Sequence, residues 1–197
     1  MRTIEKKLYR NLLMLSFILF TGGVIAQTND DYEEDGSEAI VDQEKRDELI
    51  NDANESKAAF IENSKDLNDL FQKAAGYVIF PNVGAGAYIL GGAAGNGVLY
   101  ENGEIQGYAE LRQVDIGLQF GGQAYRQAIL FQTQEELEEF KDGEYSLSGS
   151  ASAVIIKKGE AKSIDFKEGR AIVTMPKAGA MIEISVGGQK FEYRDAQ

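Results

Sequence analysis

The hydrophobic pattern of this chain changes its period at Gly76, and this change restricts the fold more than any other feature. Upstream of Gly76, apolar residues follow a helical spacing, whereas downstream they alternate with polar ones. Alternation is clear at 105–112 and 114–120, and at 145–155 the alternating polar residues are four serines. The chain after Gly76 is therefore predicted to form strands with one buried face.

Short glycine-containing pairs lie between or beside the extended runs. Such pairs accept the positive φ angles of two-residue hairpin turns, so they predict mostly antiparallel connections; they are Asn96-Gly97, Asn102-Gly103, Asp142-Gly143 and Gly187-Gly188. One brief helix is expected between strands, because Thr133 and Glu136 form a capping box. The last clear strand is predicted at 182–186.

Residues 40–75 are predicted to form two helices that use their apolar stripes to pack on the sheet. Ser64 is expected to cap the second helix with its side chain, and Gly76 to end it in a left-handed conformation. The predicted fold class is α+β, with N-terminal helices packed on a strongly curled, mostly antiparallel β-sheet, either open or barrel-like.

The N-terminus has the pattern of a cleavable signal peptide over residues 1–26. Four basic residues precede an apolar stretch at 12–26, which ends in small residues and is shorter than the roughly 20 residues that span a bilayer. An uncleaved anchor is the alternative. We expect an exported protein, periplasmic or secreted, with an acidic flexible linker at 27–38 and one domain at 39–197 that has its β-rich core at 77–193.

Residue types that are missing restrict the chemistry of the chain. It contains no histidine and no cysteine, which excludes most hydrolase designs and nearly all transition-metal sites. We therefore expect no catalytic residue, no metal and no cofactor. Without residues 1–26 the formal charge falls from −12 to −15, and such a field repels nucleic acid phosphates.

Two segments are candidates for lipid binding. The first is glycine-rich and lacks the motifs of phosphate-binding loops, so its glycines either bring backbone close to a lipid or form kinks in a curled sheet; they are Gly84, Gly86, Gly91 and Gly92. The second segment, 157–177, has a local charge of +3 and is an anion-binding surface or an ordinary exposed strand; its basic residues are Lys157, Lys158, Lys162, Lys167, Arg170 and Lys177.

From about Leu67 to Tyr193 the sequence resembles the SYLF family, also called the Ysc84 actin-binding domain, and is most similar to its exported bacterial branch. The resemblance is carried by AAGYVIFPNVGAGAYILGGAAGNGVLYENGEIQGYAELRQVDIGLQFGGQAYRQAILF, by FKDGEYSLSGSASAV and by MPKAGAMIEISVGGQKFEY. It implies a lipid-binding module without catalysis. Two departures from the family are an acid-rich segment at 42–65, where eukaryotic members carry basic residues, and Ala85, where many bacterial relatives have lysine.

Three functional hypotheses follow. The first is non-enzymatic binding of an anionic phospholipid, phosphoinositide-type or other, at an envelope membrane through the two candidate segments. The second is a carrier that encloses an apolar ligand inside the curled sheet. The third is a structural protein of envelope assembly, whose protein partner the sequence does not identify. Actin is not expected as a partner of an exported protein.

Overall fold

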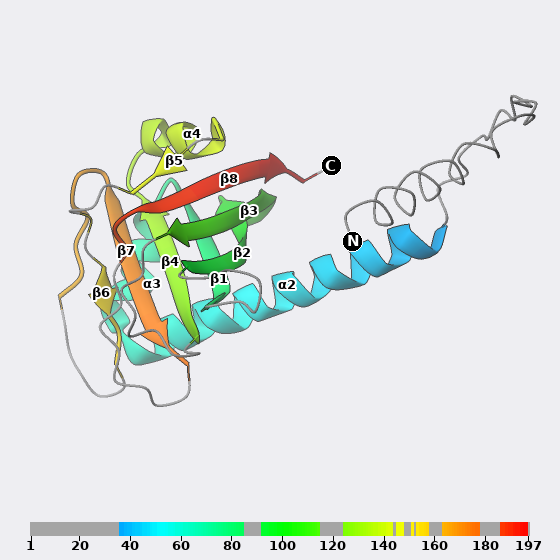
Figure 1. Cartoon of the computed structure of the whole chain (residues 1–197). Coiled ribbons are helices and arrows are strands. Elements are labelled where there is room, and N and C mark those ends of the chain that lie inside the picture. Colours follow the sequence, from blue (N-terminus) through cyan, green and yellow to red (C-terminus); the bar gives the residue numbers. More distant parts are fainter. Residues whose placement is uncertain are drawn as a thin grey trace, which may run out of the picture. The chain divides into compact units, whose positions relative to one another are not determined.

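A computed structural model of the chain describes most of the predicted domain (Figure 1). The described residues are 36–84, 92–114, 124–143, 145–147, 151, 153–157, 163–177 and 186–196. The predicted signal peptide and most of the predicted linker lie outside them. Residues 37–197 form one compact unit, and no described helix is long and apolar enough to cross a membrane.

Two consecutive helices precede the sheet, as the apolar stripes predict. They are α2, Gly36–Asn63, and α3, Lys65–Lys73, and α2 takes in the last residues of the predicted linker. Ser64 occupies the N-cap position of α3, but its side chain makes no capping hydrogen bond, so that detail of the prediction is wrong. Its carbonyl oxygen instead accepts from the Leu67 amide at 3.2 Å.

Gly76 does not end α3, which is a second correction to the predicted helix boundary. The helix ends before Ala74, whose backbone is extended, and Gly76 is the first residue of a strand. A Cβ atom at Gly76 would lie 2.8 Å from the Leu137 side chain and 2.9 Å from the Tyr100 carbonyl oxygen. Gly76 is therefore required for close packing rather than for a left-handed turn.

The strands form one eight-stranded sheet in the order β5-β8-β3-β2-β1-β4-β7-β6, and every pair is antiparallel except β6 with β7. One short helix, α4, lies between β4 and β5. The bounds of these elements are β1 Gly76–Gly84, β2 Gly92–Glu101, β3 Glu104–Val114, β4 Ala124–Phe131, α4 Gln134–Lys141, β5 Tyr145–Ser146, β6 Val154–Ile155, β7 Arg170–Pro176 and β8 Gln189–Asp195.

The sheet is curled into a half-barrel, because strands that are distant in the strand order contact each other across its inner face. Gln127 of β4 donates a 2.8 Å hydrogen bond to Gln189 of β8, although three strands separate β4 from β8 in the sheet. Phe80 of β1 lies with its ring centre 5.6 Å from that of Phe191 in β8. The predicted α+β class with a strongly curled sheet is confirmed.

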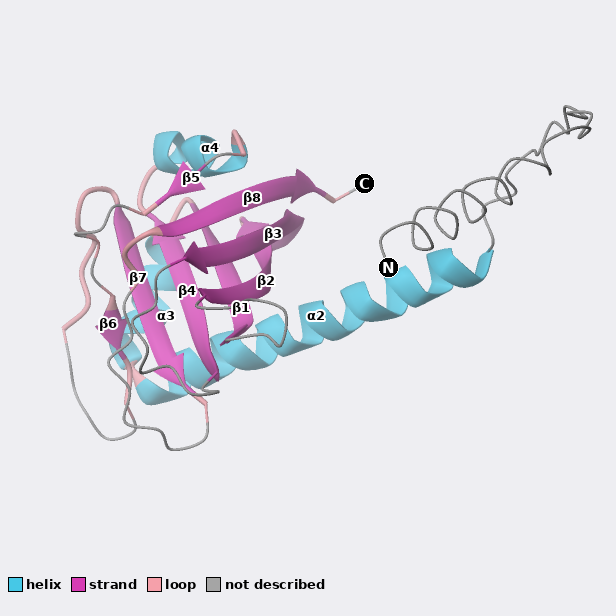
Figure 2. Cartoon of the chain, viewed as in Figure 1, coloured by secondary structure: helices cyan, strands magenta, loops and turns pink. Residues whose placement is uncertain are grey.

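Two hydrophobic cores lie on opposite faces of this sheet. The inner core includes Phe80, Tyr125 and Phe191, and α4 closes one end of it with Leu137 and Phe140. On the outer face, α2 and α3 bury a second core (Figure 2); its helical members include Ala53, Phe60, Leu67, Leu70 and Phe71. The predicted packing of the N-terminal helices on the sheet is thus observed.

The predicted glycine turns differ in outcome. Asn102-Gly103 joins β2 to β3 with φ angles of 55° and 84°, which confirms that hairpin. Asp142-Gly143 follows α4 instead, where Gly143 has a φ of 101°, so this pair ends a helix. Gly188 has a φ of 77°, but the predicted strand at 182–186 lies almost wholly outside the described residues, as does most of the run at 114–120.

Asn96-Gly97 is not a turn, contrary to the prediction. Both residues lie inside β2, where Gly97 pairs with Ala109 of β3. A Cβ atom at Gly97 would lie 2.7 Å from the Phe80 ring, so the glycine makes room for a large aromatic residue of the neighbouring strand. Tertiary packing explains this glycine where local turn statistics do not.

The serine-alternating run at 145–155 is not one strand. Its first residues form β5 beside β8, and its last form β6 beside β7, at opposite edges of the sheet. The chain passes from one edge to the other within these few residues because the sheet is curled. The final strand, β8, was not predicted.

Candidate functional site

The sheet has two ends, and the predicted site residues are divided between them. We call the end that holds Gly84, Gly92 and Lys177 the loop end; Gly84 pairs with Ala124, and the Lys177 amide donates to the Ala124 carbonyl. The opposite end holds Gly76, Glu101, Phe131 and Arg170 and is covered by α4, so we call it the α4 end.

Both candidate segments reach the loop end. Gly84 ends β1 and Gly92 begins β2, while Lys157 follows β6 and Lys177 follows β7, the strand parallel to β6. The structure therefore places the ends of the glycine-rich segment and two of the predicted lysines at the same end of the sheet. Four further candidates lie outside the described residues; they are Gly86, Gly91, Lys158 and Lys162.

Lys167 and Arg170 lie at the α4 end, so the basic segment does not form one continuous surface. The seven residues of β7 separate them from Lys177 by about 20 Å. Arg170 is also occupied: it donates to the Tyr145 hydroxyl, and its guanidinium lies 3.6 Å from a carboxylate oxygen of Glu136. Burial lowers the pKa of Arg170, but Tyr145 and Glu136 outweigh burial and raise it overall.

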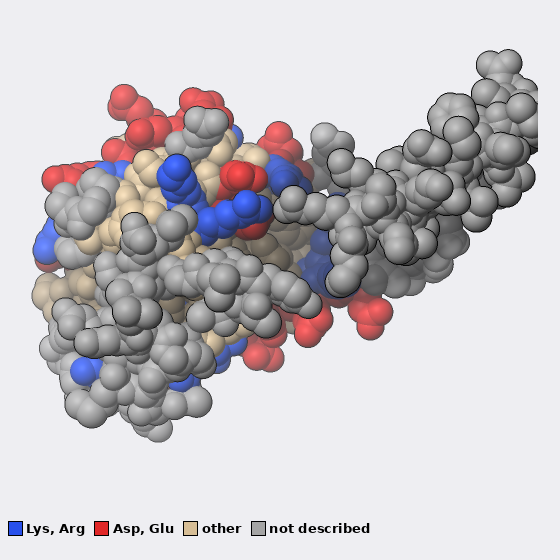
Figure 3. Space-filling view, in the orientation of Figure 1, with Lys and Arg blue, Asp and Glu red and all other residues tan. Residues whose placement is uncertain are grey.

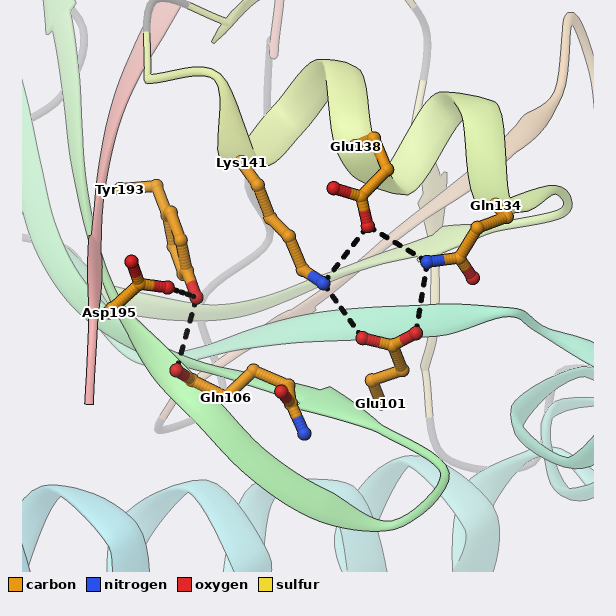
Figure 4. A network of polar contacts seen from close by, with 7 residues as sticks. All are labelled: Glu101, Gln106, Gln134, Glu138, Lys141, Tyr193 and Asp195. Atoms are coloured by element: carbon orange, nitrogen blue, oxygen red, sulfur yellow. Dashed lines mark hydrogen bonds and ion pairs between the residues drawn. The ribbon is translucent and has the colours of Figure 1, made fainter. Parts of the chain in front are cut away.

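A second ion-pair network fixes α4 to the same end of the sheet (Figure 4). The Lys141 ammonium donates to Glu101 at 2.7 Å and to Glu138 at 3.2 Å, and Gln134 donates to both carboxylates. The hydrogen bond from Lys141 lowers the pKa of Glu101, against a smaller opposing effect of burial. Nearby, the Tyr193 hydroxyl lies 2.9 Å from the Asp195 carboxylate and 3.1 Å from the Gln106 carbonyl, and the two acceptors share its single proton.

These contacts leave the α4 end acidic on its surface. Glu135, Glu138 and Glu139 of α4 are exposed, whereas the cations Lys141 and Arg170 are partly buried in ion pairs. Figure 3 shows acidic side chains gathered over α4, while basic side chains are scattered over the rest of this face. Within the residues that the structure describes, no acidic group is arranged to hold a metal ion.

Buried amide side chains lie on the inner face near the loop end. Gln113, Gln127 and Gln189 are at most 3% exposed and, with the Tyr125 hydroxyl, form one hydrogen-bonded cluster. Burial raises the pKa of Tyr125 above its ordinary range. The inner core is thus filled by the protein's own side chains over its described residues.

A groove of about 570 Å³ lies on the outer face between α2 and strands β2, β3 and β8. Its charged residues are of both signs, including Lys45, Arg46 and Arg194 beside Asp52 and Glu192. Arg46 lies 5.6 Å from the ring centre of Tyr108, in a cation–π arrangement that links α2 to β3. With cations and carboxylates interspersed, this groove has no clear preference for an anion.

Sequence reasoning missed two polar residues at the loop end, Arg126 and Asn82. In β4, Ala128 and Leu130 face the outer core, and alternation places Arg126 on that same outer face. Asn82 lies in a β-bulge of β1, and its side-chain oxygen accepts a 3.3 Å hydrogen bond from Lys177. A single arginine on an otherwise apolar strand face was the signal that could have identified this site.

Part of the chain matches a known protein family. The model of the Ysc84 family, described as "Las17-binding protein actin regulator", matches residues 112–197. That segment includes α4, strands β4 to β8, and both Arg126 and Lys177. No curated protein matches the chain. Residues 112–197 of this chain therefore match the Ysc84, or SYLF, family, as the sequence motifs predict.

Proposed function

We propose that this protein is an exported, non-enzymatic module that binds anionic phospholipid at an envelope membrane, with its loop end toward the bilayer. The observation that carries the proposal is the placement of Gly84, Gly92, Lys157 and Lys177 at the same end of the sheet. The Ysc84 family is known for lipid and actin binding and is not a known enzyme family, which supports the lipid assignment.

The distribution of charge favours this orientation. The acidic surface of α4 lies at the other end of the sheet, so an anionic bilayer repels that end and attracts the loop end. Each basic residue at an anionic membrane surface contributes on the order of 1 kcal/mol, and salt screens this attraction. A protein with a formal charge of −15 after cleavage is therefore expected to bind weakly, and less tightly as the ionic strength rises.

Co-sedimentation with vesicles tests the proposal, using residues 27–197 because the apolar segment 12–26 would itself insert into lipid. We expect pelleting with vesicles of phosphatidylcholine and phosphatidylglycerol at low salt, a loss of pelleting as salt increases, and none with phosphatidylcholine alone. The Lys157→Gln/Lys177→Gln double variant should bind less than Lys73→Gln/Lys167→Gln, which changes the charge equally at the α4 end. Equal binding by the two variants would contradict the orientation, and absence of pelleting would contradict lipid binding.

The carrier hypothesis receives less support from the structure, because packed residues and the amide cluster fill the described inner face. Native mass spectrometry of gently extracted protein separates the two functions. A carrier retains a lipid through purification, whereas a peripheral binder releases it. Fractionation of cells that express the full chain tests export, and recovery of uncleaved protein in the cytoplasm would contradict it.

A further inference from the structure

We propose that Asn82, Arg126 and Lys177 form a binding site for a doubly charged phosphate monoester on the outer face of the sheet at the loop end. This site deepens the proposed function, on which it rests, by naming a chemical group that the loop end would recognise. None of the three residues was assigned this role by the family match.

The three residues lie side by side on adjacent strands. β1, β4 and β7 are neighbours in the sheet, and Arg126 of β4 pairs with Met175 of β7. Because Met175 belongs to the outer core, alternation along β7 brings Lys177 to the same face, diagonal to Arg126. On the other side, Asn82 lies in the bulge opposite Arg126, between the pairs Phe80–Gln127 and Val83–Tyr125.

The hydrogen bond of Lys177 shows where its ammonium lies. Its Nζ atom donates to the Asn82 side-chain oxygen at 3.3 Å, so the lysine side chain extends from β7 across β4 to β1. Neighbouring strands are about 4.8 Å apart, which means that the ammonium passes over the strand that carries Arg126. Two cationic groups are therefore held close together on one face.

Neither cation is neutralised by the described part of the protein. No described carboxylate oxygen lies within 4.0 Å of Arg126 or Lys177, in contrast to the ion pairs of Lys141 and Arg170 at the α4 end. The Arg126 Nε atom is shielded from solvent and forms no hydrogen bond. Adjacent like charges repel each other, and an unpaired buried donor is unfavourable, so an anion placed here would relieve both.

The chemistry of the three groups matches a phosphate monoester. An arginine guanidinium binds two phosphate oxygens at once, and a lysine ammonium adds a second positive charge. The Asn82 amide nitrogen supplies a neutral donor while its oxygen orients Lys177. Two cations favour a group of charge −2 over the single charge of a phosphodiester. Such a group is found at the head of some phospholipids and also in soluble phosphate esters.

Vesicle binding and thermal shift with residues 27–197 distinguish these two sources. We expect wild-type protein to bind vesicles containing phosphatidic acid several-fold more tightly than phosphatidylglycerol vesicles of equal surface charge. Arg126→Gln and Lys177→Gln should each abolish that preference, whereas Lys167→Gln, which removes an exposed charge at the α4 end, should retain it. Stabilisation by soluble glycerol 3-phosphate, lost in Arg126→Gln, would assign the site to free phosphate esters as well.

The site and the proposed function can fail separately. If wild-type protein pellets equally with both vesicles and glycerol 3-phosphate does not shift its melting temperature, the site is refuted while lipid binding stands. If no anionic vesicle binds but glycerol 3-phosphate stabilises wild type and not Arg126→Gln, the site stands and membrane binding is refuted. Far-ultraviolet circular dichroism shows whether each variant is folded. If Arg126→Gln unfolds, Lys177→Gln provides the test, because the Lys177 ammonium makes its hydrogen bond at the surface.

Discussion

The pair of buried glutamines that joins β4 to β8 predicts a large loss of stability when Gln127 is truncated. Gln127 donates to the Gln189 side-chain oxygen at 2.8 Å and accepts from the Gln189 side-chain nitrogen at 3.1 Å. Both residues are fully buried. In the variant Gln127→Ala, the Gln189 oxygen loses its donor within the described part of the protein, although its nitrogen keeps Gln113 and Tyr125 as partners.

Two effects add up in this variant. A buried acceptor without a donor costs about 1–3 kcal/mol. The lost methylene and amide leave a cavity of roughly 50 Å³, which at about 24 cal/mol per Å³ adds about 1 kcal/mol. We therefore expect Gln127→Ala to lower the free energy of unfolding by about 2–4 kcal/mol. Gln127→Leu retains the volume and should lose about 1–3 kcal/mol, which separates the hydrogen bond from the cavity.

Urea unfolding followed by far-ultraviolet circular dichroism measures these differences, since the chain contains no tryptophan. Gln132→Ala is the matched control, because Gln132 is exposed just after the same strand and should change stability by no more than about 0.5 kcal/mol. A loss below about 1 kcal/mol in Gln127→Ala would show that the amide bridge does not hold the half-barrel closed.

Three further predictions concern packing and ionisation. Gly97→Ala should destabilise the fold by about 1–3 kcal/mol, because the added methyl group would overlap the Phe80 ring of the neighbouring strand. Gly103→Ala has space for its methyl group but a φ of 84°, so it should cost about 1 kcal/mol. Urea unfolding measures both variants. Lys141→Met should lower the free energy of unfolding by about 1–2 kcal/mol at neutral pH. Because Lys141 lowers the pKa of Glu101 below 4.5, wild type should lose this advantage over the variant as the pH falls below about 4.5. Equal acid sensitivity of the two proteins would contradict the ion pair. Burial raises the pKa of Tyr100 from 10.0 to about 12. The contribution of Tyr100 to the stability of the fold should therefore be fully present below pH 10 and be lost as the pH approaches 12. An alkaline titration of tyrosinate absorbance would detect this as delayed ionisation of the folded protein relative to the unfolded protein.

The fold was predictable where burial follows a simple period. Ala109 and Leu111 alternate with more exposed neighbours in β3, and Phe60 and Leu67 lie on the buried stripes of α2 and α3. In these elements one face meets water and the other meets the core, so the sequence pattern records the burial directly. The fold class and the number of N-terminal helices follow from such patterns.

Prediction failed where distant parts of the chain determine a residue's role. Asn96-Gly97 has the composition of a turn, but Gly97 is a glycine because Phe80, from another strand, occupies the space of its side chain. The run at 145–155 has a strand period, yet it is divided between the two edges of the sheet. Neither contact is visible in local sequence, since both depend on how the sheet curls.

The candidate site was predicted only in part for a related reason. Closeness in sequence suggested that the basic residues of 157–177 form one surface, but an extended strand separates Lys167 from Lys177 by its full length. Arg126 was overlooked because it is isolated in sequence, and its closeness to Asn82 and Lys177 becomes visible only when β1 and β7 are placed on either side of β4. Strand order, rather than local charge density, brings Arg126 and Lys177 together.

The two ends of the sheet show why net charge alone does not decide what this protein binds. Both ends contain cations in a strongly acidic chain, but at the α4 end Lys141 and Arg170 are matched by carboxylates from α4, from the β2–β3 hairpin and from the turn before β7. At the loop end, the described residues place no carboxylate beside Arg126 or Lys177. Pairing with carboxylates therefore uses Lys141 and Arg170 for stability, whereas no described carboxylate competes with an anion for Arg126 and Lys177. A −15 protein can attract phosphate at that end because screening limits the effect of distant carboxylates to about 10 Å at moderate salt.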